Sequence, residues 1–289
     1  MSLTTTTIAK EANLSEPEGM PPQPRNVEAY VGYCANEAGE MLVGTFPRPG
    51  EPTVDVVSWT MAPKLIHDLR GSDDKFTLET AGFQLLRHKS RFEDWTPDED
   101  VRKAYMEEMQ EVVQELTGAS KALAYDYRLR HLQGPARGTH VDLNDKALFW
   151  RLHRAFGDEA HDLIREYRIQ AITVWRPFRI VYKDPLAIMD GRSCSQSEFV
   201  EYNVRKADAG SHVYETMSYV LVPSDAHRWY YLHEQKEDEC WLIKNYDTED
   251  NRGPRFTPHV SFMDKAYEGR EKRESVEVRL FVFHEKEIV

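Results

Sequence analysis

The sequence predicts an α+β protein whose core is a double-stranded β-helix, or jelly roll, flanked by helices. Helical periodicity is confined to two stretches between about residues 97 and 167. After them come seven short apolar runs separated by turn residues, which is typical of strands. A helix-rich segment followed by many short strands favours a β-sandwich or jelly roll wrapped by helices.

The first 25 residues contain four consecutive threonines and a proline-rich stretch at 20–24, with little apolar surface to bury. This composition predicts a disordered arm. Residues 26–119 then form a segment of strands and one helix that packs on the core. Its first half alternates short apolar runs with turn residues such as Pro47 to Gly50, which predicts strands or extended cover.

A helix is predicted from Pro97 to Leu116. Thr96 is suited to the N-cap, Pro97 to the first helical position, and Gly118 to the residue that ends the helix. One face of this helix should pack on the body, because its apolar residues recur at helical spacing. They are Val101, Tyr105, Met109, Val112, Val113 and Leu116.

Residues 120–289 are predicted to form the jelly-roll catalytic core, with an inserted helix at about 145–167 that is interrupted near Gly157. A strand at 122–132 leads into a glycine-bounded turn before His140. The seven later strands are expected at 171–179, 199–204, 214–222, 229–233, 240–246, 259–262 and 275–283.

The composition narrows the choice of partners. With 49 acidic and 37 basic residues the net charge is −12, which argues against nucleic acid or an anionic membrane, since both attract basic patches. No apolar run approaches the ~20 residues that a membrane-spanning helix needs. The three cysteines are too few and too widely spaced for a disulfide framework. These features predict a soluble cytoplasmic protein with a small-molecule substrate, and a homodimer is compatible with them.

The segment from Gly138 to Asp142 is the first candidate site. Side chains alternate along a strand, so His140 and Asp142 share one face while Val141 points into apolar packing. A second histidine would complete the two-histidine, one-carboxylate set that binds non-haem Fe(II). The spacing alone is weak, because His-x-Asp also arises as an exposed polar pair.

His259 is the best third ligand among the eleven histidines, because it opens a strand after a proline-bearing turn. The strand that follows places Val276 and Val278 on one face and Ser275 and Arg279 on the other, with Arg273 sharing the polar face. A guanidinium with a neighbouring hydroxyl suits the distal carboxylate of a dicarboxylic acid. Arg273 and Ser275 are therefore the predicted anchor for such an acid.

The order His-x-Asp, distal His, Arg-x-Ser resembles the signature of Fe(II)/2-oxoglutarate-dependent dioxygenases. Further segments look like the branch of secondary metabolism related to gibberellin desaturases and cephalosporin methoxylases. They are 170–177, 184–187, 229–231, 243–247 and 273–279, and the resemblance runs from Leu65 to the C-terminus.

The resemblance implies that His140, Asp142 and His259 bind Fe(II) and that Arg273 and Ser275 hold 2-oxoglutarate. The implied reaction uses O₂ to oxidise a C–H bond of a small secondary metabolite, by hydroxylation, desaturation, ring closure or peroxide formation. Two other functions stay open: a non-catalytic metal-binding accessory protein, and a methyltransferase, for which no glycine-rich loop after a strand gives support.

Several residues have competing interpretations. Arg279 and Lys244 are charged residues within strand patterns, and Arg279 rivals Arg273 as the anchor because it has the same parity. Trp175 and Arg176 either face the substrate or serve as core residue and structural ion-pair partner.

Five other histidines complete the candidates. His131 either lines the pocket or packs, and His153 and His161 are expected to be solvated on their helix. His227 and His233 are expected in a solvated turn, with a second metal site as the alternative.

Overall fold

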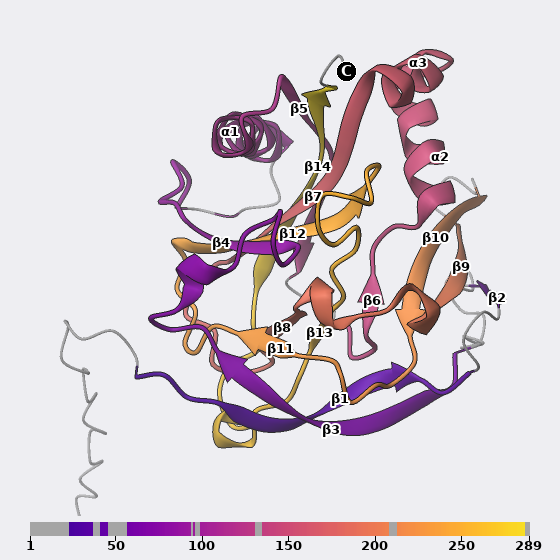
Figure 1. Ribbon diagram of the computed structural model, residues 1–289. Helices are drawn as coiled ribbons and strands as arrows, with labels where there is room; N and C mark the ends of the chain where they lie inside the picture. The colour runs from indigo at the N-terminus through magenta and orange to yellow at the C-terminus, as the bar shows by residue number, and fades with distance from the viewer. Residues whose placement is uncertain are drawn as a thin grey trace, which may run out of the picture.

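The computed structural model describes residues 23–36, 41–45, 57–93, 95, 99–130, 135–207 and 213–286. Within these ranges the chain forms two β-sheets flanked by helices, as the jelly-roll prediction required (Figure 1). The helices are α1 (Glu99–Thr117), α2 (Asp145–Phe156) and α3 (Glu159–Glu166). The strands are β1 (Val27–Cys34), β2 (Met41–Thr45), β3 (Trp59–Asp68), β4 (Phe83–Arg87), β5 (Lys121–Arg130), β6 (His140–Val141), β7 (Tyr167–Pro177), β8 (Leu186–Met189), β9 (Phe199–Ala207), β10 (Val213–Leu221), β11 (Trp229–Tyr231), β12 (Glu239–Asp247), β13 (His259–Ser261) and β14 (Ser275–Glu285).

The smaller sheet has the strand order β4-β12-β7-β14-β5, and helix α1 packs across one of its faces (Figure 1). Met109 and Val113 of α1 share an apolar cluster with Val276 and Val278 of β14. Alternate residues of β14 point to the opposite face, where Phe281 joins the core between the two sheets. The expected alternation along this strand is confirmed.

The larger sheet has the order β1-β3-β11-β8-β13-β6-β10-β9-β2 among the described residues. The early strands therefore do more than cover the core: β1 to β3 extend this sheet, and β4 extends the other. Strand β8 lies between β11 and β13 and was not predicted. Its four residues are all buried, so it lacks the alternation that marks a strand with one polar face.

The inserted helix is interrupted where the sequence indicated. Helix α2 begins after Asn144, whose side chain accepts a hydrogen bond from the backbone N–H of Ala147, and it ends at Gly157 with φ +60°. Helix α1 is likewise followed by Gly118 at φ +63°. Thr96, Pro97 and the turn at 47–50 lie outside the described residues, as does the arm up to residue 22. No helix in the described ranges is long and apolar enough to cross a bilayer.

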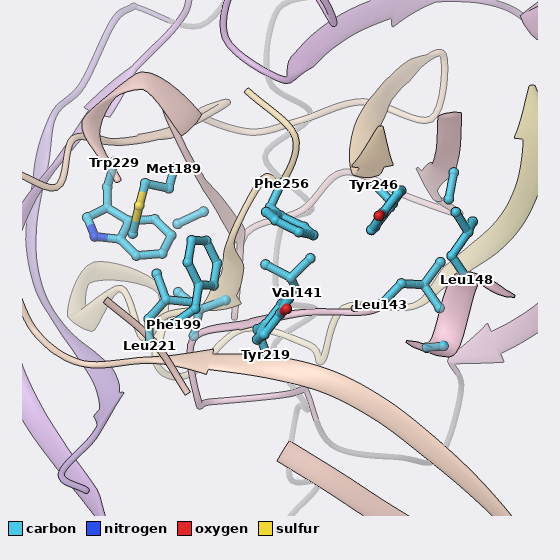
Figure 2. Packing of buried hydrophobic residues seen from close by; sticks show 14 of the residues in the cluster. Val141, Leu143, Leu148, Met189, Phe199, Tyr219, Leu221, Trp229, Tyr246 and Phe256 are labelled. Carbon is cyan, nitrogen blue, oxygen red and sulfur yellow. The ribbon is translucent and has the colours of Figure 1, made fainter. Parts of the chain in front are cut away.

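The buried cluster in Figure 2 fixes strand β6. Val141 is fully buried there and lies among aromatic side chains that include Tyr219 and Phe256. Because side chains alternate along the chain, burying Val141 turns its neighbours His140 and Asp142 to the opposite side. The apolar core thereby orients the polar residues of the candidate site.

Candidate metal centre

His140, Asp142 and His259 converge on one point. Strands β6 and β13 pair with His140 directly opposite His259, and the two ring centroids are 4.5 Å apart. The His140 Nε2 atom lies 3.8 Å from Asp142 Oδ1. One ligand atom from each of the three residues lies within 4.8 Å of the others, a spacing that could hold a metal ion.

Backbone carbonyls orient both imidazole rings. His140 Nδ1 lies 2.8 Å from the carbonyl oxygen of Gly138, and His259 Nδ1 lies 3.2 Å from that of Thr257. A carbonyl can only accept, so each Nδ1 donates its proton to the carbonyl, and Nε2 is the nitrogen of each ring that can ligate a metal. Burial and the neighbouring His140 lower the pKa of His259 to about 4, which keeps this imidazole neutral at pH 7.

Asp142 is held in its ionised form. Its Oδ2 accepts a hydrogen bond from Arg279 Nε at 2.9 Å. Burial by itself would raise the pKa of Asp142, but the positive charge of Arg279 holds it well below its ordinary value. Two neutral imidazole nitrogens and one carboxylate oxygen are the donors that a mononuclear non-haem Fe(II) site uses, so these residues fit that ion.

A cavity opens onto these three residues. Its apolar wall is formed by Trp175, Leu186 and Ile243, and Arg273 lies among its polar residues. The site thus combines a small polar cluster with an apolar wall, as ligand pockets generally do.

Arg273 is a half-buried cation for which the described part of the chain supplies no ion pair. Its Nη1 donates to the backbone carbonyl of Asp184 at 2.8 Å, and its guanidinium lies 5.0 Å from the centroid of the Trp175 ring. The Asp184 carboxylate is itself paired with Arg137. Among the described residues no carboxylate forms an ion pair with Arg273. Burial lowers the pKa of Arg273 to about 10 for this reason.

Ser275 is fully buried two residues further along, at the start of β14. Its hydroxyl has no hydrogen-bond partner in the described part of the chain. Ser275 does not itself line the cavity, whereas Arg273 and all three candidate ligands do.

Two rival anchors are already engaged elsewhere. Arg279 contacts three carboxylates, those of Asp142, Asp126 and Glu277, and so is not available to a dicarboxylic acid. Lys244 is fully buried and pairs with Asp247 at 3.0 Å, outside the cavity. These contacts pair each cation within the fold. They argue against Arg279 and Lys244 as the residue that anchors the acid.

The two candidate substrate-contacting residues, Trp175 and Arg176, lie in different places. Trp175 lines the cavity, but the Arg176 side chain lies away from it. The Arg176 guanidinium donates to the Tyr105 hydroxyl and to the carbonyls of His88 and Glu237, each at 2.8 Å. These contacts hold Arg176 within the fold, but through a hydroxyl and carbonyls, whereas its second interpretation expected an ion pair. His131 lies outside the described residues.

His227 and His233 are both buried, so the expected solvated turn is wrong. His227 lies near Cys194 and Glu198 in a second group whose ligand atoms are within 4.8 Å of one another. Both His227 nitrogens are already hydrogen-bonded, to the Tyr33 hydroxyl and to Glu198. These bonds explain the burial of His227 without a metal.

Sequence reasoning missed the residues that surround Asp142. Asn245 accepts a hydrogen bond from the Asp142 backbone N–H at 3.2 Å, and it sits where the register between β12 and β7 shifts. Glu277 lines the cavity and pairs with Arg130. The parity of β14 indicated that Glu277 faces the site, but no sequence signal marks the irregularity at Asn245.

Residues 31–283 match a protein family described as an oxidoreductase/YMDC permease-like domain. The chain is 30% identical to the "alpha-ketoglutarate-dependent dioxygenase tstK" of Talaromyces stipitatus, over 78% of this chain and 86% of that protein. It is 27% identical to the "Fe(II)/2-oxoglutarate-dependent dioxygenase nvfI" of Aspergillus novofumigatus, over 88% and 94% of the two chains. A solved structure of the "iron and alpha-ketoglutarate-dependent endoperoxidase NvfI W199F variant" superposes with a TM-score of 0.78 at 27% identity, covering 92% of this chain and all of that one.

Proposed function

The chain belongs to the Fe(II)/2-oxoglutarate-dependent dioxygenases of secondary metabolism, and we propose that His140, Asp142 and His259 bind its iron while Arg273 and Ser275 hold 2-oxoglutarate. As a member of this family it uses Fe(II), 2-oxoglutarate and O₂ to oxidise a small secondary metabolite. The observation that carries the residue assignment is the convergence of the three ligand atoms beside Arg273, a half-buried arginine with no ion-pair partner in the described chain.

Bound iron would supply O₂ activation coupled to the oxidative decarboxylation of 2-oxoglutarate to succinate and CO₂, and thereby the oxidation of a substrate C–H bond. The protein's part is to present three ligands in the right protonation state. The hydrogen bonds from Nδ1 to Gly138 and Thr257 leave the two Nε2 atoms free to ligate. Asp142 is already ionised and His259 is already neutral, so neither needs to lose a proton before metal binds.

Arg273 supports binding of the cosubstrate's far carboxylate. A buried guanidinium that lacks a counter-charge gains a charge-assisted, bidentate pair when a carboxylate enters. The Trp175 ring beneath it fixes the guanidinium plane. The unpaired hydroxyl of Ser275 supplies a further donor on the same strand face.

The apolar wall of the cavity supports an apolar carbon skeleton as substrate, with Trp175 in contact with it. Relatives named as a dioxygenase, hydroxylase/desaturases and an endoperoxidase support hydroxylation, desaturation or peroxide formation as outcomes, and ring closure stays a further possibility of the same C–H oxidation. Which one occurs depends on which substrate carbon lies nearest the three ligands.

Anaerobic addition of Fe(II) and 2-oxoglutarate tests the site directly. We expect the visible charge-transfer band of the iron chelate in the wild type and its loss in His140→Ala and Asp142→Ala. The His153→Ala variant is the control, because His153 is exposed on α2. A wild type without the band refutes the cosubstrate assignment, and a band that survives in both site variants places the metal elsewhere.

The anchor is tested separately by calorimetric titration with 2-oxoglutarate. Arg273→Ala should weaken 2-oxoglutarate binding by about tenfold or more, because a hydrogen bond to a charged group is worth roughly 1.5–3 kcal/mol. Metal affinity should stay close to that of the wild type. Lys272→Ala is the matched control, since Lys272 also lines the cavity but is exposed. Equal losses in the two variants would reject a specific anchor.

Two competing functions predict other results. A non-catalytic accessory protein forms no succinate from 2-oxoglutarate even with candidate substrates present. A methyltransferase binds S-adenosylmethionine, which calorimetry detects. The family relationship favours the oxygenase over both.

We further propose that the enzyme works in the cytoplasm as a homodimer. Its three cysteines are all free thiols, which suits a reducing compartment.

The dimer is proposed from an exposed surface. Strands β1 and β3 expose the large apolar side chains of Tyr30, Met61 and Leu65, which a second copy would cover. Sedimentation equilibrium should give twice the monomer mass, and a monomer at all concentrations contradicts the dimer.

A further inference from the structure

The two carboxylate oxygens of Asp142 have different surroundings. Oδ1 faces His140 Nε2 at 3.8 Å, whereas Oδ2 is hydrogen-bonded to Arg279. We propose that Arg279 and Asn245 are positioning residues, which hold Asp142 so that it offers only Oδ1 to the metal. This inference rests on the proposed function, in which Asp142 is a ligand.

Arg279 is fixed by three acidic groups: one on the neighbouring strand β5, one on its own strand β14 and one just after β6. Its Nη1 donates to Asp126 Oδ2 at 2.6 Å and its Nη2 to Glu277 Oε2 at 3.2 Å, while Nε contacts Asp142. Glu277 is in turn paired with Arg130 at 3.0 Å. The planar guanidinium, 4% exposed, is therefore held on all sides and keeps its Nε aimed at Asp142.

An irregularity in β5 makes this arrangement possible. In the pairing of β14 with β5, Arg279 lies opposite Asp126 and Leu280 lies opposite Ala124. One residue of β5, Tyr125, therefore has no partner in β14. Such a bulge resets which side chains face a site. Here it places Asp126 beside Arg279, while the Tyr125 ring stacks on Phe281 with centroids 4.1 Å apart.

Asn245 holds Asp142 from the other sheet. It occupies the register shift of β12 between Lys244 and Tyr246, and it is 2% exposed. Its Oδ1 accepts from the Asp142 backbone N–H at 3.2 Å, and its Nδ2 donates to Thr173 Oγ1 at 2.8 Å. A second irregular strand position thus points its side chain at the same aspartate.

Together these contacts fix both the backbone and the side chain of Asp142. Groups that orient a metal ligand typically contribute 10- to 100-fold to metal affinity. Their loss should also change the geometry of the bound ion, because the carboxylate would be free to rotate.

Co(II), a redox-stable probe, tests the inference with the full-length protein under anaerobic conditions. Arg279→Gln should raise the Co(II) dissociation constant about 10- to 100-fold and alter the ligand-field absorption spectrum. Arg128→Gln is the matched control: it removes a guanidinium that contacts Asp126 and has no hydrogen bond to Asp142. It should leave both readouts near those of the wild type.

Two more variants separate positioning from folding. Arg279→Lys restores the charge without the fork, so we expect thermal stability to recover while the Co(II) spectrum stays altered. Asn245→Ala should weaken Co(II) binding through the backbone contact alone. If Arg279→Gln does not fold, these two variants carry the test.

The outcomes distinguish this inference from the proposed function. Folded Arg279→Gln and Asn245→Ala with the wild-type Co(II) affinity and spectrum overturn the positioning role only. A spectrum that recovers fully with stability in Arg279→Lys also overturns it. If the His140→Ala variant binds Co(II) as the wild type does, the metal site itself is refuted.

Discussion

The hydroxyl of Ser275 is a polar group that the fold buries without a partner in the described chain. Leaving such a group unsatisfied costs about 1–3 kcal/mol, which a bound carboxylate would offset. Ser275→Ala should therefore weaken 2-oxoglutarate binding about tenfold and leave the free energy of unfolding unchanged or slightly higher.

Calorimetry with 2-oxoglutarate and urea denaturation check the Ser275 prediction. Ser218→Ala is a suitable control, because Ser218 is also a buried strand serine, but it does not line the cavity and its hydroxyl donates to the Tyr202 backbone carbonyl. Unchanged 2-oxoglutarate affinity in Ser275→Ala would remove Ser275 from the anchor.

Arg176 shows how burial distinguishes a structural cation from a binding one. Arg176→Met should lower the free energy of unfolding by about 3 kcal/mol, because it leaves a tyrosine hydroxyl and two backbone carbonyls without their donor. Folded Arg176→Met should bind 2-oxoglutarate as the wild type does. A loss of that affinity without a loss of stability would return Arg176 to the binding site.

At the scale of elements, the short strand β13 depends on a contact with the loop before β4. The Thr257 hydroxyl donates to the Gly82 carbonyl at 2.7 Å, and the Thr257 carbonyl orients His259. Gly82 has φ +84°, and a Cβ added there would lie 2.2 Å from Thr257 Oγ1. The loop before β4 thus sets the position of the distal histidine.

Gly82→Ala should reduce stability by about 2–4 kcal/mol, since it combines backbone strain with a steric clash. It should also weaken Co(II) binding by displacing Thr257. Gly118→Ala is the control: Gly118 has φ +63° but open space around it, so only strain of about 1–2 kcal/mol is expected. Urea denaturation and Co(II) titration would show whether the two glycines differ; equal effects would exclude the Thr257 contact as the cause.

At the scale of the whole molecule, a buried ionic network joins β7, β12 and the loop before β4. Asp247 is paired with Arg168 at 2.6 Å and with Lys244 at 3.0 Å, and Arg168 also contacts Glu79. Burial would raise the pKa of Asp247, but Arg168 and Lys244 lower it below the ordinary value of 3.8. The stabilisation is therefore fully present above about pH 4 and is lost as the pH falls below that value.

Asp247→Asn should cost about 3–5 kcal/mol at pH 7, because it leaves two buried cations poorly paired. The difference from the wild type should shrink below pH 4, as the wild-type carboxylate becomes protonated. Asp162→Asn, on the exposed surface of α3, should change stability by no more than about 0.5 kcal/mol at any pH. Urea denaturation from pH 7 to pH 3 measures both; a constant Asp247→Asn difference contradicts the network.

Periodicity predicted most strands and all three metal-ligand candidates, because each signal lies within a few residues. The alternation expected along β14 placed Arg279 on the cavity side, where Arg273, just before the strand, also lies, whereas Ser275 does not line the cavity. The alternation could not show which cation is free, since that depends on partners from distant strands, such as Asp126 for Arg279. The contact of Asn245 with Asp142 was not predicted, because an irregular strand position breaks the side-chain alternation from which the faces of a strand are assigned.

Strand β14 lies between β7 and β5, although β5 precedes it by a long stretch of chain; Arg130 and Glu277, which pair across them, are 147 residues apart. During synthesis on the ribosome, β5 and β7 therefore emerge before β14. The edge of each strand that pairs with β14 stays unpaired until β14 has been made. Unpaired edges are aggregation-prone, so chaperone protection during synthesis would have its largest effect on this part of the nascent chain. Arg279 arrives with the same strand, so its contact with Asp142 forms only when the sheet is complete.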